Sequence, residues 1–419
     1  QRSCPNWLKR SRRIYKNKLQ RTRHLVNEPA MNFYPKTARQ TNFVNLARTL
    51  AGQIAPRAAQ HDRAGSFAFE NYADLRAAGL PSLPVPTDLG GLGAGLLESL
   101  MTVEELAKGD GSTALNLTMH MQVIGQAAEA RTWPEDLFAE VCTAAVQHGA
   151  LINAAATEPE MGSPSRGGKP STTAQPLYND VNNTPVVWLL NGRKSYASMC
   201  PTLDYIIIPA VLKDGSDDVA RFLVRVADHR ADDLSIVETW DALGMRSTGS
   251  HDLILNNVRV ADSAIIARGD EPQSNKGSPV NAWFMLLVSA TYLGVAEAAL
   301  ITAAEYARTR VPTALGKPIA EVEGIQRQLG HASLLIHQAQ LALYATAELW
   351  DRRPEQRSNL GASVAVAKVP ATNNAIAAVD HCMRAAGGAS MSKSLPLERY
   401  YRDVRGGLLH PINDDAAYI

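Results

Sequence analysis

The stretch VVWLLNGRKSYAS, residues 186–198, has the periodicity of a β-strand. Its β-branched and aromatic residues recur with a spacing of two, which favours a strand over a helix. Three further runs, DYIIIPAVL, ARFLVRVAD and HDLILNNVRVAD, lie between residues 204 and 262 and are separated by turn-forming residues. We therefore predict a small antiparallel β-domain of roughly six strands from about residue 150 to 266.

On both sides of this β-region, apolar residues recur every three or four positions, which is typical of amphipathic helices. After residue 266, three long helical segments with short connections predict an antiparallel bundle. The predicted fold class is α+β, with an N-terminal α-helical domain, a central antiparallel β-barrel and a C-terminal four-helix-type bundle. The predicted bounds of these domains are residues 31–149, 150–266 and 267–419.

The composition is that of a globular protein with a large core. Of the 419 residues, 45% are hydrophobic and 20% are charged, which is enough for two or three packed units. No apolar run approaches the roughly 20 residues of a membrane-spanning helix, so no membrane segment is expected. The four cysteines lie far apart and lack metal-ligand spacing, which predicts reduced thiols in the cytoplasm and no metal site.

The first 30 residues differ in charge from the rest of the chain. They hold nine of the 42 lysines and arginines and one of the 41 acidic residues, so the remainder carries a net charge of −7. A mildly acidic body argues against nucleic acid as a partner. Residues 1–30 have no apolar periodicity and precede Met31. We interpret them as a non-native extension, with a transit peptide as the alternative.

Four stretches, in order along the chain, resemble motifs of the acyl-CoA dehydrogenase superfamily. ATEPEMGSPSRGG at 156–168 resembles its TEP-x-x-GS loop, and NGRKSYAS at 191–198 resembles its NG-x-K-x-W-I-T strand. ALGMRSTGSHDLILNNVRV at 242–260 resembles its LGMR strand pair, and AAGGASMSKSLPLERYYRDVR at 385–405 resembles its GG and RD-x-R signature. The resemblance extends from about Thr41 onward and implies the same order of helices, β-domain and bundle.

The resemblance implies a bound flavin, which is FAD or, alternatively, FMN as a reduced co-substrate. Ser198 stands where family members have the Thr that hydrogen-bonds the flavin, and Tyr196 stands in the Trp position. Thr157 and Ser163 lie on the loop that contacts the flavin in the family, and Ser163 also matches a position that can contact a CoA substrate. Hydroxyls and amides suit this task because they hydrogen-bond the flavin and are not themselves oxidised.

The resemblance also implies diphosphate-binding residues in the bundle, which serve the flavin of a neighbouring subunit. Arg308 or Arg310 is placed to neutralise phosphate with its planar guanidinium, with a solvated basic face as the alternative. Gly387 and Gly388 allow close backbone approach to a phosphate. Gln326 matches a family Gln and is a weaker candidate for the ribityl or adenine end. A homodimer or homotetramer is therefore expected.

Family dehydrogenases remove the α-proton with a Glu, and other residues occupy both of its alternative positions here. The usual position aligns with Pro411 and the other falls near Phe284, and neither residue can accept a proton. His410 precedes this proline and resembles the C-terminal His of the monooxygenase branch, typified by dibenzothiophene monooxygenase. Asp414 and Asp415 are alternative bases if the terminal loop folds back.

Asn116 and His120 are two further candidate catalytic residues. They are four residues apart on a predicted helix, so they share one helical face that can reach the substrate. An interior histidine with satisfied hydrogen bonds is the alternative interpretation of His120.

These observations predict a flavin-dependent oxidoreductase of this superfamily that lacks the usual catalytic Glu. The alternatives are a two-component flavin monooxygenase with His410 near the flavin, and a non-catalytic flavin-binding or assembly subunit. The expected partners are a small-molecule substrate and an electron-transfer protein or flavin reductase. The substrate is an acyl-CoA or a heteroatom or aromatic compound, and the expected location is the cytoplasm.

Overall fold

The computed structural model describes residues 34–161, 168–179, 184–269 and 281–417. The predicted leader at 1–30 and the candidate Ser163 lie outside the described residues. Phe43–Ile419 form one compact unit, and Gln1–Asn42 form a separate unit in which the first long helix begins.

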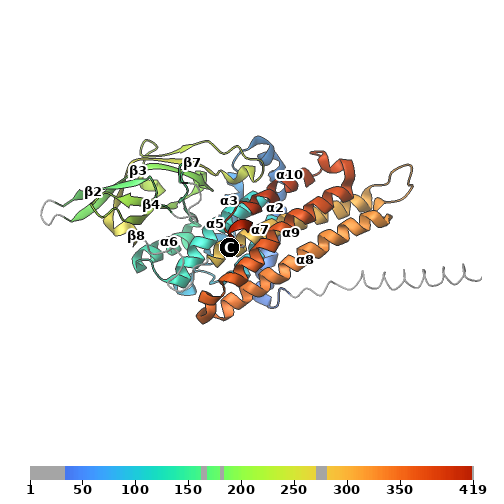
Figure 1. Cartoon of the computed structure of the whole chain (residues 1–419), viewed down its shortest axis with the longest axis horizontal. Helices are drawn as coiled ribbons and strands as arrows, with labels where there is room; N and C mark the ends of the chain where they lie inside the picture. Colours follow the sequence, from blue (N-terminus) through green and yellow to red (C-terminus); the bar gives the residue numbers. More distant parts are fainter. Residues whose placement is uncertain (1–33, 162–167, 180–183, 270–280, 418–419) are drawn as a thin grey trace, which may run out of the picture. The chain divides into compact units, whose positions relative to one another are not determined.

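In the described part of the chain before the sheet, the predicted helices are present (Figure 1). They are α2 (Ala38–Ala64), α3 (Phe69–Ala77), α4 (Leu96–Ala107), α5 (Gly111–Ala130) and α6 (Glu135–His148). Helix α5 is buried along most of its length. Asp110 caps its N-terminus, because the carboxylate accepts a hydrogen bond from the backbone N–H of Thr113 at 3.0 Å. This buried helix carries Asn116 and His120.

The middle region forms one sheet from all of its described strands. They are β1 (Ile152–Ala154), β2 (Thr173–Tyr178), β3 (Pro185–Ala197), β4 (Tyr205–Leu212), β5 (Val219–Arg225), β6 (Leu234–Val237), β7 (His251–Ala261) and β8 (Ile265–Arg268). Their order is β6-β7-β3-β2-β4-β5-β8, and β1 pairs with β4.

The strand order refines the prediction of a closed antiparallel barrel. The order has two edges, β6 and β8, so the sheet is open. Both β1 and β2 run parallel to β4, so the sheet is mixed. The reason is physical: β-periodicity identifies strands but not their partners, and connections longer than a hairpin allow parallel pairing.

The C-terminal region is the predicted helical bundle. Its long helices are α7 (Ala282–Thr309), α8 (Glu323–Arg352) and α9 (Gly361–Ala386), which lie side by side in Figure 1. The short helices α10 (Leu397–Asp403) and α11 (Asp414–Ala417) follow. An added Cβ at Gly294 of α7 would lie 2.1 Å from the backbone oxygen of Glu104, so glycine permits the close approach of α4 and α7.

One helix corrects the statement that no apolar run approaches the length of a membrane-spanning helix. Helix α7 is long and apolar enough to cross a membrane by length and composition, with a mean hydropathy of 1.8 over 18 residues. In the structure, 78% of that window is buried inside the protein. Because its apolar surface is covered by neighbouring helices, α7 is the central helix of the bundle.

Candidate functional site

A β-bulge in β3 shapes the candidate flavin edge. Lys194 pairs with Leu253 of β7, and Ala197 pairs with His251, so β3 carries one extra residue between these pairs. Tyr196 lies in the bulge with φ +55°, and its side chain is 64% exposed. An exposed aromatic ring held by irregular backbone is available to stack on a planar ligand.

The hydroxyl of Ser198 belongs to a chain of hydrogen bonds. It lies 2.8 Å from the hydroxyl of Ser250, which lies 2.8 Å from the hydroxyl of Thr248. Thr248 donates to the backbone oxygen of Met245 at 3.0 Å. Because Ser198 is half-buried at the end of this chain, its side chain is both positioned and reachable.

The Tyr196 ring is connected to the same loop. It lies edge-to-face with Trp240, with ring centroids 6.1 Å apart. The indole Nε1 of Trp240 donates to the backbone oxygen of Met245 at 3.0 Å. Tyr196 and Ser198 are therefore both linked, through different neighbours, to one carbonyl of the loop between β6 and β7.

A buried ion pair holds the loop with Thr157 against β3. The Thr157 carbonyl accepts a hydrogen bond from the Ser195 N–H at 2.8 Å. The next residue, Glu158, binds Lys194 Nζ at 2.5 Å, and both side chains are fully buried. Burial opposes ionisation of Glu158, but hydrogen bonds from Lys194 and from two hydroxyls lower its pKa to about 2.

Sequence reasoning gave no role to Glu158 or Lys194, although both lie in the quoted motifs. The signal was present, because a charged residue in an alternating strand points to a partner when its face is buried. What the sequence could not show is that these two residues, 36 positions apart, pair with each other.

Asn116 and His120 both lie on α5, but their surroundings differ. The Asn116 amide nitrogen donates to Tyr72 Oη at 2.5 Å and to the Thr248 carbonyl at 2.9 Å, while its Oδ1 is buried without a hydrogen-bond partner. His120 Nε2 lies 2.8 Å from the Pro81 carbonyl, and its Nδ1 accepts from the Ile152 N–H at 3.2 Å.

These contacts separate the two candidates. His120 uses both ring nitrogens on backbone groups, which supports the interpretation of a satisfied interior histidine. Burial lowers its pKa to about 4, so the ring is neutral near pH 7. Asn116 stands beside the Thr248 segment and retains an unpaired acceptor, which keeps it a candidate for contact with a bound molecule.

His410, in the C-terminal segment, packs against two aromatic rings of α7. Its ring is 6.0 Å from that of Phe284 and 5.8 Å from that of Tyr292, between centroids. Its Nδ1 lies 3.1 Å from the Gly406 carbonyl and 3.0 Å from Tyr292 Oη. The two alternative base positions predicted from the sequence, near 284 and at 410–411, are thus neighbours in the fold.

The partners of His410 determine its protonation. The Gly406 carbonyl can only accept, so its hydrogen bond requires a hydrogen on Nδ1, which the Tyr292 hydroxyl oxygen then also faces as an acceptor. In this tautomer Nε2 is the basic nitrogen. Burial lowers the pKa to about 4, and the nearby cation of Lys368 contributes to this shift. Near pH 7 the ring is neutral, with Nε2 unpaired among the described residues.

Sequence reasoning missed Tyr292 and Lys368. Lys368 is fully buried on α9, and its Nζ donates to the Gly407 carbonyl at 3.2 Å. A lone lysine in the apolar run VAVAKVPA was the available signal. Asp414, the alternative base, accepts from Asn373 of α9 at 2.8 Å through Oδ2, and its Oδ1 is buried without a partner.

The five bundle candidates lie at one end of the bundle. Arg308 and Arg310 are at the C-terminal end of α7, and Gln326 is in the first turn of α8. Gly387 and Gly388 follow the C-terminal end of α9. Antiparallel packing brings these ends together, as the stacked rings of His331 on α8 and His381 on α9 confirm.

The bundle residues make few contacts that would explain their identity. Arg308 pairs with Glu305 at 3.2 Å, and Gln326 donates to the Ala320 carbonyl at 2.8 Å. Gly387 has φ 61° and ψ −144°, a conformation that glycine adopts readily. Nothing in the described chain lies within 4 Å of a Cβ added at Gly388, so no internal contact requires glycine there.

The residues around the loop between β6 and β7 fit a flavin. An exposed ring, a reachable hydroxyl and an orphaned buried amide oxygen converge on the loop between β6 and β7. They supply one stacking surface and neutral hydrogen-bonding groups, and none of them is readily oxidised by a flavin. In the described ranges, no cluster of three or more His, Cys, Asp or Glu residues could hold a metal ion.

The fold and this site define a flavoprotein oxidoreductase. Family models match the chain in three consecutive parts: acyl-CoA dehydrogenase N-terminal domain at 37–131, middle domain at 153–258 and C-terminal domain at 286–415. The putative acyl-CoA dehydrogenase YdbM of Bacillus subtilis is 39% identical over 92% of this chain and 97% of its own length. The chain belongs to the acyl-CoA dehydrogenase family.

Other relatives are named as a nitrososynthase and as a monooxygenase. L-evernosamine nitrososynthase of Micromonospora is 28% identical over 90% of this chain and 88% of its own length. The FMN-bound structure of TdsC from Paenibacillus sp. A11-2, a dibenzothiophene monooxygenase, is 25% identical, with a TM-score of 0.78 and coverage of 90% of this chain and 94% of that chain.

Proposed function

We propose that this chain is the oxygenase of a two-component flavin monooxygenase that acts at nitrogen, sulfur or an aromatic carbon. The observation that carries the proposal is His410: a neutral imidazole with an unpaired Nε2 stands beside Phe284 and before Pro411, where a dehydrogenase needs a carboxylate. Family relatives named as a nitrososynthase and a dibenzothiophene monooxygenase support it.

The reaction balances with reduced flavin as the reductant. When bound, reduced flavin would supply the two electrons with which one atom of molecular oxygen enters the substrate and the other leaves as water. The protein contributes position and proton transfer. With an amine substrate, His410 Nε2 would accept the proton that leaves the nitrogen, while the Gly406 carbonyl holds Nδ1–H and thereby the tautomer.

The surroundings of Asn116 and Tyr196 suit substrate and flavin, respectively. We assign Tyr196, Ser198 and Thr157 to the flavin ring, and the unpaired Oδ1 of Asn116 to a donor on the bound molecule. The bundle end with Gly387 and Gly388 serves the flavin of a neighbouring subunit, which implies a homodimer or homotetramer. A flavin reductase supplies reduced flavin, and the protein acts in the cytoplasm.

Oxygen uptake with externally reduced FMN or FAD tests this function. We expect substrate-dependent oxygen consumption and an oxygenated product from panels of amines, thiophenes and indoles. His410→Ala should abolish product formation, whereas His337→Ala should not, because His337 is exposed and bonds only Ser333 within its own helix. Rapid anaerobic bleaching of the bound flavin by acyl-CoA thioesters would overturn the proposal.

A second candidate, acyl-CoA dehydrogenation, rests on Asp414. Its unpaired Oδ1 could act as the base, and YdbM is named as a putative acyl-CoA dehydrogenase. In that case Asp414→Asn should abolish the bleaching by acyl-CoA, and His410→Ala should not. Installing Glu at Pro411 should then raise the rate of bleaching.

A further inference from the structure

Three hydroxyl groups form a chain of hydrogen bonds that ends on a backbone carbonyl of the loop between β6 and β7. Ser198, Ser250 and Thr248 lie in hydrogen-bond contact in that order, and Thr248 donates to the backbone oxygen of Met245. Ser250 and Thr248 are 5% and 0% exposed, so water does not offer them other partners. The direction of every hydrogen bond in this chain therefore depends on its last acceptor.

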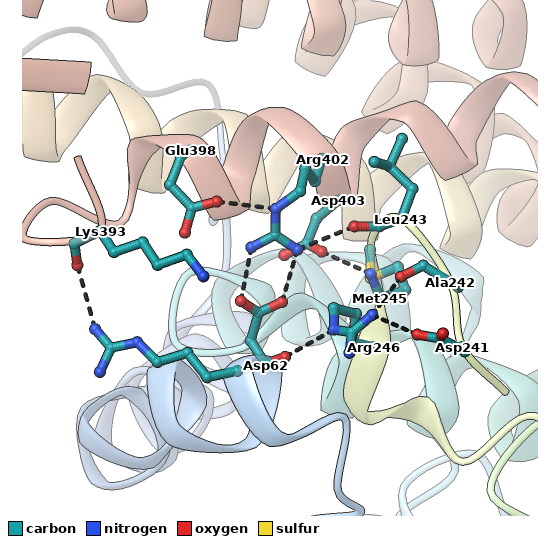
Figure 2. A network of polar contacts seen from close by, with 11 residues as sticks. Asp62, Asp241, Ala242, Leu243, Met245, Arg246, Lys393, Glu398, Arg402 and Asp403 are labelled. Carbon is teal, nitrogen blue, oxygen red and sulfur yellow. Dashed lines mark hydrogen bonds and ion pairs between the residues drawn. The ribbon is translucent and has the colours of Figure 1, made fainter. Parts of the chain in front are cut away.

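That last acceptor is held firmly from two other parts of the chain. Figure 2 shows Asp62 of α2 between Arg402 of α10 and Arg246 of the loop. Arg402 binds both carboxylate oxygens of Asp62, at 2.9 and 2.6 Å, and Arg246 Nε donates to the Asp62 carbonyl at 2.8 Å. The N–H of Met245 donates to Asp403 at 2.6 Å, which fixes the peptide of this residue.

The direction of the chain follows from what each group can do. A carbonyl only accepts, so the Thr248 proton points to Met245. Thr248 must then accept from Ser250, because its single proton is used. Ser250 in turn accepts from Ser198. The proton of Ser198 is consequently used in the bond to Ser250, so its oxygen can offer only lone pairs to a flavin bound at this edge.

This direction discriminates between the two redox states of a flavin. The reactive ring nitrogen of an oxidised flavin is a hydrogen-bond acceptor, whereas in the reduced flavin it carries a hydrogen and donates. We infer that Thr248 and Ser250 are positioning residues that hold Ser198 as an acceptor, so that the site binds reduced flavin more tightly than oxidised flavin. This inference rests on the proposed function, in which reduced flavin arrives from a separate reductase.

The inference can be tested without enzymatic turnover, by measuring the affinity of the protein for oxidised and for reduced flavin. Dissociation constants are measured anaerobically for oxidised and for dithionite-reduced FMN and FAD, with the full chain and no substrate. We expect the wild-type protein to bind the reduced form about tenfold more tightly. By linkage, a tenfold preference corresponds to a rise of about 30 mV in the two-electron potential of the bound flavin.

Two variants break the chain at different points. Thr248→Val keeps the shape of the side chain but removes the hydroxyl oxygen that accepts the Ser250 proton. Ser250 can then donate to Ser198 instead, and the Ser198 proton becomes available to oxidised flavin. Ser250→Ala frees that proton directly. Both should abolish the preference for reduced flavin, mainly by tighter binding of the oxidised form.

Thr291→Val is the matched control. Thr291 is fully buried, donates to the Leu287 carbonyl at 3.1 Å and lies 3.2 Å from the Thr118 hydroxyl. The variant therefore loses equivalent hydrogen bonds between α5 and α7, away from the hydroxyl chain. It should keep the wild-type ratio of the two affinities, even if its melting temperature falls as far as that of Thr248→Val.

The outcomes separate this inference from the proposed function. Equal affinities in the wild-type protein, tighter binding of oxidised flavin, or an unchanged ratio in both Thr248→Val and Ser250→Ala would overturn the inference, and oxygenase turnover could still stand. Preferential binding of reduced flavin without oxygenase activity would support the inference and overturn the proposed function. A wild-type protein that binds neither flavin would overturn both.

Discussion

Two histidines in different regions of the molecule, fully buried His120 and half-buried His410, share a lowered pKa and differ in their hydrogen-bond partners. Burial lowers the pKa of His120 and of His410 to about 4. The region around His120 satisfies both ring nitrogens with backbone groups of Pro81 and Ile152. The region around His410 satisfies only Nδ1. The same direction of pKa shift therefore accompanies two different environments, and only the environment of His410 leaves a ring nitrogen for the role that we propose for it.

The largest expected effect is on turnover at His410. His410→Ala removes the basic nitrogen, and loss of a positioned general base lowers the rate by about 100- to 10,000-fold. Stability should change little, because the half-buried ring contacts only Tyr292, Gly406 and Phe284 among the neighbours described above. His410→Gln should restore a function that needs a hydrogen bond but not one that needs proton transfer. Turnover and urea unfolding of both variants check this; normal turnover in His410→Ala would break the comparison.

His120 should show the opposite pattern. His120→Leu leaves the Pro81 carbonyl and the Ile152 N–H without their partner, and each unpaired buried group costs about 1–3 kcal/mol. We expect a lower free energy of unfolding and unchanged turnover per folded molecule. A variant that stays fully stable but loses activity would restore His120 to the catalytic group.

The same residue should contribute to acid unfolding. The unfolded state binds a proton on histidine near pH 6.5, but folded His120 binds it only near pH 4. Its contribution to stability is therefore fully present above pH 6.5 and declines as the pH falls toward 4, by about 1.4 kcal/mol per pH unit. Unfolding curves of His120→Leu should depend less on pH in this interval than those of the wild-type protein.

A variant of Lys368 should have a smaller effect, and only on His410. Its cation lowers the pKa of His410 and does not contribute to that of His120. Lys368→Met should raise the pKa of His410, so that the acid limb of the pH–rate profile moves to higher pH. An unchanged acid limb, with normal folding, would show that His410 does not control the rate.

Local motifs indicated candidate residues that lie close together in the chain, although their roles in the site stay predictions. Tyr196 and Ser198 belong to one strand motif, and the bulge that orients them arises within that strand. The helical, β and helical order was equally readable, because periodicity is a local property. Sheet closure and parallel pairing were not, since they depend on partners that local patterns do not specify.

The residues that surround His410 could be identified only from the folded chain. Tyr292 of α7 and Lys368 of α9 meet the C-terminal segment only because the helices cross there. Likewise, Asp62 joins two arginines of separate motifs although nothing in its own surroundings in the sequence marks it. Contacts between distant segments depend on how the helices pack, and a sequence motif identifies only one of the two segments in each contact.

The smallest predicted effect concerns Ser198, whose hydrogen-bond chain reaches α5 through Asn116, one helical turn before His120. Ser198→Ala removes one hydrogen bond to the flavin, worth about 0.5–1.5 kcal/mol, and should weaken retention of reduced flavin accordingly. Ser392→Ala is a suitable control, since its hydroxyl makes an exposed bond of 2.9 Å to Ser394 and should change nothing. If Ser198→Ala kept wild-type affinity for flavin and an unchanged reduction rate, Ser198 would not lie at the flavin edge. Asn116 would then have no hydrogen-bonded connection to the flavin through Thr248 and Ser198, and both His120 and Asn116 would be structural residues of α5.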